Sequence, residues 1–275
     1  MKKTNITEEK RKIFKRSSTT YYYSSLFFTG QTKEDVFTLY AFVRYADNLV
    51  DAIPAKKDEF TKFCKNVKRA YTGEVIGDHI IDDFIELSKR KKFEQAWTSA
   101  FLDSMKADLT KHTYHTYEEL QKYMYGSANV IGLFMCAIFD TGARALPNAQ
   151  AQGEAMQFIN FIRDIDEDFK LGRQYIPTHD VKKFHTHIPP KPGEEESFCS
   201  LVRYEIDKYR KIQQYASKGH KYIDRRFRIM VKTSADMYEW TADQIYKDPI
   251  VVFQKKIKPA KWYVIATVIK HALFS

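Results

Sequence analysis

The sequence predicts an all-α protein that folds as a single helical domain. Glycine and proline, which interrupt helices, number only 10 and 8 among 275 residues, and 44% of the residues are hydrophobic, enough to bury a large core. Apolar residues recur at helical spacing over long stretches, and no Gly- or Pro-rich linker divides the chain. We therefore expect one helical bundle over residues 1–275, with a flexible polar N-terminus over 1–16 and a surface loop over 179–197.

Charge and cysteine content restrict the partners and the compartment. A net charge of +10 favours an anionic membrane surface or a phosphorylated substrate. We expect no nucleic-acid partner, because the chain has no RNA-recognition, zinc-finger or helix-turn-helix signature. Cys64, Cys136 and Cys199 are far apart, as is typical of free thiols in a reducing, cytoplasmic compartment. The longest apolar stretches, 130–139 and 262–269, are shorter than the roughly 20 residues that span a bilayer, so we expect a soluble or peripheral protein.

The first acidic stretch ends a helix that is predicted over residues 31–51. Val36 and Val43 belong to its inward-facing apolar stripe, and Asp47 and Asp51 continue that stripe at four-residue intervals. Ionised carboxylates are rarely buried without a partner, so the pattern predicts a cation or a water-filled cavity at the inner end. A helix whose end emerges into solvent explains this stretch, taken alone, equally well.

Helical periodicity predicts most of the remaining elements, whereas residues 17–28 show no clear period and stay unassigned. The other expected helices cover residues 7–16, then 55–70 and 79–107, which together give two or three helices, 117–140, 149–171, and 198–246 with a break near Gly219.

Small residues gather inside the helix predicted over 117–140, where Gly126 and Gly132 flank Ser127 and Ala128. Each glycine costs about 1 kcal/mol relative to alanine in a helix interior. Either close helix packing or room for a bulky ligand explains them.

The second acidic stretch lies in the helix predicted over 149–171, which Gly172 caps. Gln157, Asn160, Asp164 and Asp168 form a polar seam beside an apolar stripe on this helix. A polar seam next to an apolar stripe is typical of a helix that lines a cavity.

Two carboxylate pairs on facing helices suit magnesium or manganese, which bind a few carboxylates together with waters and substrate phosphates. Such ions neutralise the charge that develops as diphosphate leaves. Arg44, Arg163 and Arg173 lie beside the two stretches and would hold the leaving group, while Asn160 offers a neutral oxygen ligand. A di-iron bundle is set aside because no histidine follows a glutamate by three residues. No Ser/His/Asp or Cys/His set stands out for nucleophilic catalysis.

On these residues the chain resembles the squalene/phytoene synthases, head-to-head prenyl synthases of the class I isoprenoid fold. The resemblance extends from about Ser17 to the C-terminal helix and is greatest to phytoene synthases. The acidic stretches match that family's two aspartate-rich motifs, and GRQYIP at 172–177 resembles its signature. The segment YMYGSANVIG at 123–132 is similar to its helix of small residues beside the prenyl channel. The resemblance implies a helical bundle with a central substrate cavity.

The motifs and the resemblance together assign roles to individual residues. The expected metal ligands are Asp47, Asp51, Asn160, Asp164 and Asp168, and the four aspartates together with Tyr175 are the expected catalytic residues. The residues expected to bind substrate are Ser18, Thr20, Tyr21, Arg44, Ser127, Gln157, Arg163, Arg173, Tyr238 and Lys255.

The resemblance implies that two geranylgeranyl diphosphates condense to phytoene in carotenoid biosynthesis. One diphosphate departs, the allylic cation attacks the other substrate's double bond, and a cyclopropylcarbinyl diphosphate forms. This intermediate ionises, rearranges and loses a proton, for which released diphosphate and Tyr175 are candidate acceptors. Squalene or dehydrosqualene formation from farnesyl diphosphate remains an alternative, with NADPH required only for squalene. A non-catalytic assembly or binding relative and a basic membrane-binding module are further alternatives.

Three positions depart from the family's pattern. Asn48 stands where many members carry a second adjacent aspartate, and Lys255 stands near an arginine position, keeping the charge without the bidentate fork. The segment around Ser25 lacks a bulkier side chain that is usual there, which bears on prenyl chain length.

The C-terminal tail, 250–275, combines a run of lysines with the apolar segment WYVIATVIKHALF. A terminal core helix and a membrane-surface helix both explain it. We expect prenyl diphosphates as substrates and, from this tail, a peripheral contact with the inner face of the membrane.

Overall fold

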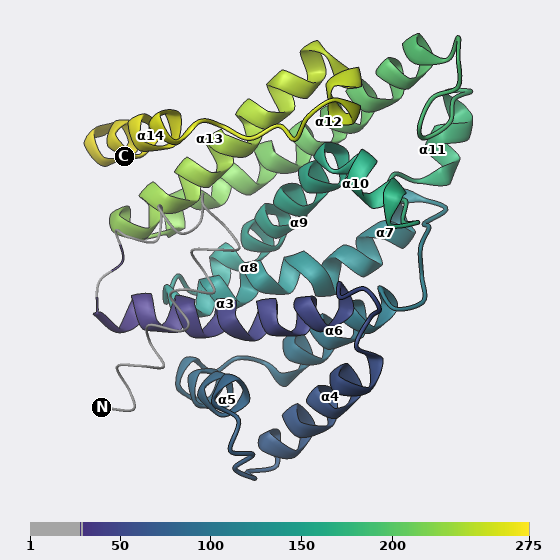
Figure 1. The fold of residues 1–275 in the computed structure, drawn as a ribbon. Coiled ribbons are helices and arrows are strands. Elements are labelled where there is room, and N and C mark those ends of the chain that lie inside the picture. Colours follow the sequence, from purple (N-terminus) through teal and green to yellow (C-terminus); the bar gives the residue numbers. More distant parts are fainter. Residues whose placement is uncertain (1–27, 29, 275) are drawn as a thin grey trace.

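The computed structural model describes residue 28 and residues 30–274, and this part of the chain is mostly helical (Figure 1). Within it no β-strand forms, and the β-type pairing is an isolated parallel bridge between Thr113 and Gln174. The all-α prediction is confirmed. Outside the described residues lie the predicted helix over 7–16 and the expected contacts of Ser18, Thr20, Tyr21 and Ser25.

The observed helices follow the predicted ones closely. In chain order they are α3 (Gly30–Val50), α4 (Lys57–Tyr71), α5 (His79–Lys91), α6 (Gln95–Ala107), α7 (Tyr117–Met124), the π-helical turn η1 (Tyr125–Asn129), α8 (Val130–Ile138), η2 (Ala143–Ala145), α9 (Leu146–Arg163), α10 (Ile165–Lys170), α11 (Thr178–Lys183), α12 (Glu195–Ser217), η3 (Lys218–Tyr222), α13 (Arg225–Lys247), η4 (Pro249–Phe253) and α14 (Lys261–Phe274).

Local signals fix several helix ends. The side chain of Asp78 accepts a hydrogen bond from the second residue of α5, and Thr116 caps α7 in the same way. Pro147 stands in the first turn of α9, where its missing N–H costs nothing. Gly172 follows α10 with φ of +72°, the left-handed conformation that ends helices.

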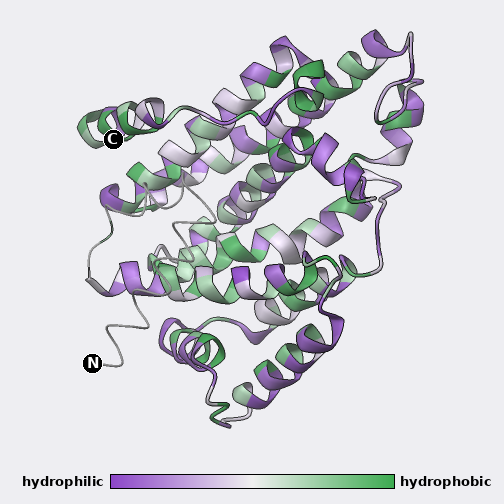
Figure 2. Cartoon of the chain, viewed as in Figure 1, coloured by the Kyte–Doolittle hydropathy of each residue, from purple (hydrophilic) through white to green (hydrophobic). Residues whose placement is uncertain are grey.

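The helices bury their apolar faces in two hydrophobic clusters. One joins α3, α4, α5, α6 and α8, where the rings of Phe42 and Phe84 stack with centroids 3.7 Å apart. The other surrounds α7, α9 and α12 and includes the fully buried Phe158 and Tyr209. Helix α9 packs on both α8 and α12, and Figure 2 shows hydrophobic residues concentrated on the inner faces of these helices. The bundle is therefore built around α9.

Two predicted helices are interrupted. The π-helical turn η1 divides the helix predicted over 117–140, and Asp164 divides the one predicted over 149–171. Asp164 has φ of −99° and ψ of 16°, and Arg163 donates two hydrogen bonds to its carboxylate. Spacing could not show these breaks, because the flanking residues keep a helical period across them.

The surface loop predicted over 179–197 is shorter than expected. It begins inside α11, and α12 already starts at Glu195. Pro177 presets the entry into α11, and Glu195 and Glu196 favour the N-terminus of α12 because they oppose its dipole. The composition of this stretch did not indicate where α11 and α12 start.

Helices α8 and α9 approach each other backbone to backbone. A Cβ atom at Gly132 would lie 2.0 Å from the Ala149 carbonyl oxygen, and one at Gly153 would lie 2.2 Å from that of Ala128. Glycine is required at both positions, because any side chain would separate the helices.

We expect Gly132→Ala to lower the free energy of unfolding by about 1–3 kcal/mol, since the added methyl group overpacks this contact. Helix propensity alone predicts the opposite sign, a gain of about 1 kcal/mol. Chemical denaturation measures the difference. Ser99→Ala, at an exposed position of α6, is the control for propensity. A Gly132→Ala variant as stable as the wild type would contradict the close approach.

Candidate functional site

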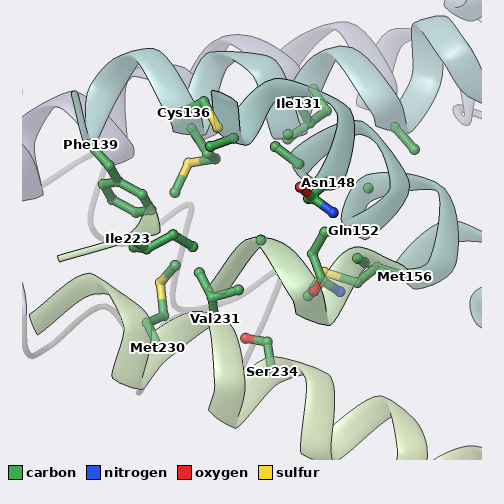
Figure 3. A pocket seen from close by; sticks show the side chains of 18 of the residues that line it. Ile131, Cys136, Phe139, Asn148, Gln152, Met156, Ile223, Met230, Val231 and Ser234 are labelled. Atoms are coloured by element: carbon green, nitrogen blue, oxygen red, sulfur yellow. The ribbon is translucent and has the colours of Figure 1, made fainter. Parts of the chain in front are cut away.

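An apolar cavity of about 340 Å³ is lined by α3, η1, α8, α9 and α13, with further residues from η2, α12 and η3 (Figure 3). Leu39 and Val43 line it from α3, Ile131 and Met135 from α8, and Met156 from α9. The surface they form is shaped for an apolar ligand.

The two acidic stretches continue two walls of this cavity. Val43 lines the cavity on α3, and Asp47 lies one helical turn farther along the same face. Asn160 lines it near the end of α9, and Asp164 follows one turn later. The same two helices therefore carry an apolar wall and, beyond it, a carboxylate.

The first pair is crowded. Burial raises the pKa of Asp47 to about 6, repulsion from Asp51 adds to the increase, and the ion pair with Arg44 opposes it. Asp51 lies just past the end of α3 and accepts a hydrogen bond from Arg173 at 2.9 Å.

In the second pair, the charge of Asp164 is well neutralised by its neighbours, whereas that of Asp168 is not. Burial alone would raise the pKa of Asp164, but Arg163 and Lys256 outweigh it and lower the pKa. The Arg163 fork donates to the two Asp164 oxygens at 2.9 and 2.5 Å, and Lys256 Nζ lies 3.2 Å away. Burial, followed by repulsion from Asp164, raises the pKa of Asp168 to about 7.

Arg173 joins the two stretches. Its guanidinium donates to Asp51, while its backbone N–H donates to the Asp168 carbonyl oxygen at 2.8 Å. Asp51 also contributes to the raised pKa of Asp168, so the carboxylates of the two stretches repel one another. The structure thus brings together the two stretches that the sequence singled out.

The donor set fits a hard divalent cation. The Oδ1 atom of Asn160 is buried without a hydrogen-bond partner among the described residues, and Asp47 and Asp168 have raised pKa values. A cation with oxygen ligands would give the Asn160 oxygen a partner and would favour the ionised form of Asp47 and Asp168. Between residues 30 and 274, however, no three acidic, histidine or cysteine side chains converge into a ready ion site. Arg44, Arg163 and Arg173 partner the carboxylates instead.

Three of the expected substrate-binding residues, Ser127, Gln157 and Tyr238, line the cavity, as does Asn160, which was expected as a metal ligand. The hydroxyl of Ser127 is buried with no hydrogen-bond partner in the described part of the chain. The same holds for Ser234, which lines the cavity from α13 (Figure 3) and was not expected. Its position one turn before Tyr238 on the same helix could have indicated it.

Both explanations for the small residues of 123–132 hold. A Cβ atom at Gly126 would lie 2.1 Å from the Ala100 carbonyl oxygen, so this glycine permits close helix packing. Ser127, Ala128 and Gly132 line the cavity and leave room for a ligand.

Tyr175 is buried and is not among the residues that line the cavity. Its hydroxyl donates to Asp108 at 3.2 Å, its ring stacks on Phe161 at 4.0 Å, and burial raises its pKa. The hydroxyl therefore keeps its proton. This arrangement favours a positioning role, in which Tyr175 holds the segment that carries Arg173, over the expected role in proton acceptance.

Asp108 is a site residue that the sequence reasoning missed. It is buried just after α6, and it accepts hydrogen bonds from Tyr175 and, at 2.8 Å, from Tyr123. Burial raises its pKa to about 6 against the effect of these bonds. Asp108 continues the buried stripe of Phe101 and Met105, which is the signal that pointed to Asp47.

The structure shows where Lys255 and Asn48, two departures from the family pattern, lie. Lys255 is exposed, and its neighbour Lys256 is the residue that contacts Asp164 and Glu167. Lys256 is thus the lysine of this segment that pairs with the second acidic stretch. Asn48 is exposed on α3, about 100° around the helix from Asp47.

Comparisons with known proteins agree with this geometry. The family model described as squalene/phytoene synthase matches residues 14–263. The 15-cis-phytoene synthase of Synechococcus elongatus is 24% identical over 93% of this chain and 88% of that protein. The one from Synechocystis is 26% identical over 90% and 78%.

Solved structures share the fold. A dehydrosqualene synthase in complex with ligand superposes with a TM-score of 0.88 at 20% identity, over 98% of this chain and 96% of that one. A squalene synthase from Alicyclobacillus acidocaldarius gives 0.77 at 21% identity, over 88% and 93%. The fold is therefore the isoprenoid synthase bundle that the resemblance implies. The chain belongs to the squalene/phytoene synthase family.

Proposed function

We propose that this protein is a prenyltransferase that condenses two geranylgeranyl diphosphates head to head into phytoene. The observation that carries the proposal is the continuity of each wall, in which α3 and α9 run from an apolar cavity into a carboxylate- and arginine-rich end. A prenyl diphosphate has the same division into an apolar tail and a charged head. Relatives named 15-cis-phytoene synthase, matched over most of their length, support the choice of product.

The charged end is proposed to hold the diphosphates. Arg44, Arg163 and Arg173 already lie there as hydrogen-bond donors, and they can exchange a carboxylate for a phosphate oxygen. Magnesium or manganese, when bound, would neutralise the charge that builds up on departing diphosphate. The proposed ligands are Asp47, Asp51, Asn160, Asp164 and Asp168.

The cavity is proposed to protect the cations that follow. Its apolar walls exclude water, which would quench an allylic cation. Tyr40 and Tyr238 also line it, and aromatic rings attract positive charge. Two substrates yield phytoene, two diphosphates and two protons, one lost as the cyclopropane ring forms and one in the last step. Because Tyr175 already donates its hydroxyl to Asp108, we assign the final proton to released diphosphate.

Incubation of the purified chain with magnesium and either geranylgeranyl or farnesyl diphosphate, followed by mass spectrometry of the hydrocarbons, tests the proposal. We expect phytoene from geranylgeranyl diphosphate, with no effect of NADPH. Squalene or dehydrosqualene as the main product would overturn the proposed substrate. If neither compound releases diphosphate, the proposal that the chain is an enzyme would fail, and the alternative of a non-catalytic relative would remain.

Replacement of Asp47 or Asp164 by alanine should lower turnover by at least about a hundredfold, since each removes a proposed ligand of the cation that would neutralise the departing diphosphate. Asp166→Ala is the matched control, because its carboxylate pairs with Lys170 in the same helix. Circular dichroism confirms that each variant is folded. Retained activity in the two test variants would contradict the proposed metal role.

The raised pKa values of Asp47 and Asp168 predict how magnesium affects stability. Both carboxyls bind protons more tightly in the folded chain than at the ordinary value of 3.8, so their contribution to stability falls as pH rises from about 4 to about 7. Above that range they are ionised and repel their neighbours, and a bound cation relieves the repulsion.

Magnesium should therefore raise the melting temperature more at about pH 8 than at about pH 5.5, where the two carboxyls are largely protonated. Differential scanning fluorimetry measures the shift. Asp168→Asn should reduce the shift at the higher pH, and Asp166→Asn should leave it unchanged. An equal shift at both pH values would contradict the account.

We also propose that the chain binds the cytoplasmic face of an anionic membrane through α14. No helix in the described part of the chain has both the length and the hydropathy to cross a bilayer. Helix α14 packs on α13 through Val264, Val268 and His271, so the core-helix explanation holds for that face. Its opposite face exposes Trp262, Ile265, Ile269, Leu273 and Phe274, with Lys261 and Lys270 beside them. Exposed apolar residues flanked by lysines are typical of interfacial helices.

Replacement of Trp262, Ile265 and Ile269 together by serine should weaken binding to phosphatidylglycerol-containing vesicles at least tenfold, because about 1.5 kcal/mol or more is lost for each buried apolar side chain. Cosedimentation measures binding. Val75→Ser, at an equally exposed position far from α14, is the control. Unchanged vesicle binding by the folded triple variant would contradict the proposal that α14 binds the membrane.

A further inference from the structure

One end of the cavity is formed by an aromatic side chain that cannot easily move. Phe139 lines the cavity together with Ile223 and Met230, at the end away from Met156 (Figure 3). Behind it, the ring of Phe227 stacks on Phe139 with centroids 4.4 Å apart and an angle of 11° between the planes. Phe28 meets both rings edge-on, at 5.4 and 5.5 Å.

This aromatic end lies opposite the charged end. Helix α8 runs antiparallel to α9, since Gly132 meets Ala149 while Ala128 meets Gly153. Phe139, just past the end of α8, is therefore far from Asn160 at the end of α9. From Ser127 to Phe139 the helical rise gives a path of roughly 18 Å. A tail whose diphosphate is held by the aspartates would extend toward Phe139.

We propose that Phe139, supported by Phe227 and Phe28, is the floor of the prenyl cavity and sets the longest prenyl diphosphate that the protein accepts. The inference rests on the proposed function, since it needs the tail to lie along this path. A longer tail would have to displace Phe139, whose ring is 6% exposed and has two aromatic rings behind it. In the close-packed interior such a displacement is costly.

The test compares the binding of thiolodiphosphate analogues of farnesyl, geranylgeranyl and farnesylgeranyl diphosphate, which do not ionise readily. Isothermal titration calorimetry with magnesium gives the affinity of each. Phe139→Ala should raise the affinity for the farnesylgeranyl analogue relative to the geranylgeranyl analogue at least tenfold, because tail atoms enter the space of the ring. Phe139→Trp should favour the farnesyl analogue by a similar factor.

Phe134→Ala is the matched control. It removes the same kind of side chain five residues earlier, within α8, but its ring packs against Phe84 and Phe93, away from the cavity. Phe139→Leu serves if the alanine variant does not fold, and a shift in the same direction is expected. An unchanged affinity ratio in folded Phe139 variants, or an equal change in Phe134→Ala, would contradict the proposal that Phe139 limits the length of the prenyl tail. If the wild type binds the analogues but turns over no prenyl diphosphate, the proposed function fails while the affinity ratio still decides the floor.

Discussion

The repulsion among carboxylates that lie close together is the constraint on which the site depends. Asp47, Asp51, Asp164 and Asp168 lie at the ends of two helices that pack in the core, and two of them have pKa values raised to about 6 and 7. Arg173 holds the arrangement together, because its side chain reaches Asp51 while its backbone bonds to Asp168. Such an arrangement destabilises the chain unless a cation or a ligand relieves it, which is typical of a functional site.

The fold supplies rigidity around this strained end. Glycines at 132 and 153 let α8 and α9 meet backbone to backbone, so the cavity wall and the second acidic stretch share one stiff unit. Asp108 adds a second anchor, because its carboxylate accepts hydrogen bonds from Tyr175, in the segment after Gly172, and from Tyr123 on α7. The short parallel bridge between Thr113 and Gln174 ties the same segment to the loop between α6 and α7. Arg173 is thus positioned by backbone and side-chain contacts that lie outside the cavity.

Sequence reasoning reached the helices and the acidic ends because both follow from local spacing. The stripe that contains Val43 predicted where Asp47 points, and the seam from Gln157 to Asp168 predicted a cavity wall. It did not identify Asp108 and Ser234, although each lies on a helical stripe, because only contacts distant in sequence show that Asp108 accepts a hydrogen bond from Tyr175 and that Ser234 lines the cavity. The contact of Lys256 with Asp164 likewise joins distant parts of the chain. It also overlooked the breaks at Asp164 and in η1 and the start of α11, because one irregular residue leaves the average period intact. The family resemblance placed the stretches face to face, which spacing alone could not do.

The central claim is that the two acidic stretches form one cation-dependent diphosphate site. Calorimetric titration of the purified chain with inorganic diphosphate, with and without magnesium, tests it most directly, because no prenyl tail or turnover is involved. The account predicts tight binding with magnesium, little binding without it, and loss of the magnesium-dependent part in Asp51→Asn and Asp168→Asn alike, since both stretches contribute. Diphosphate binding that is independent of magnesium, or that survives removal of either carboxylate, would contradict it.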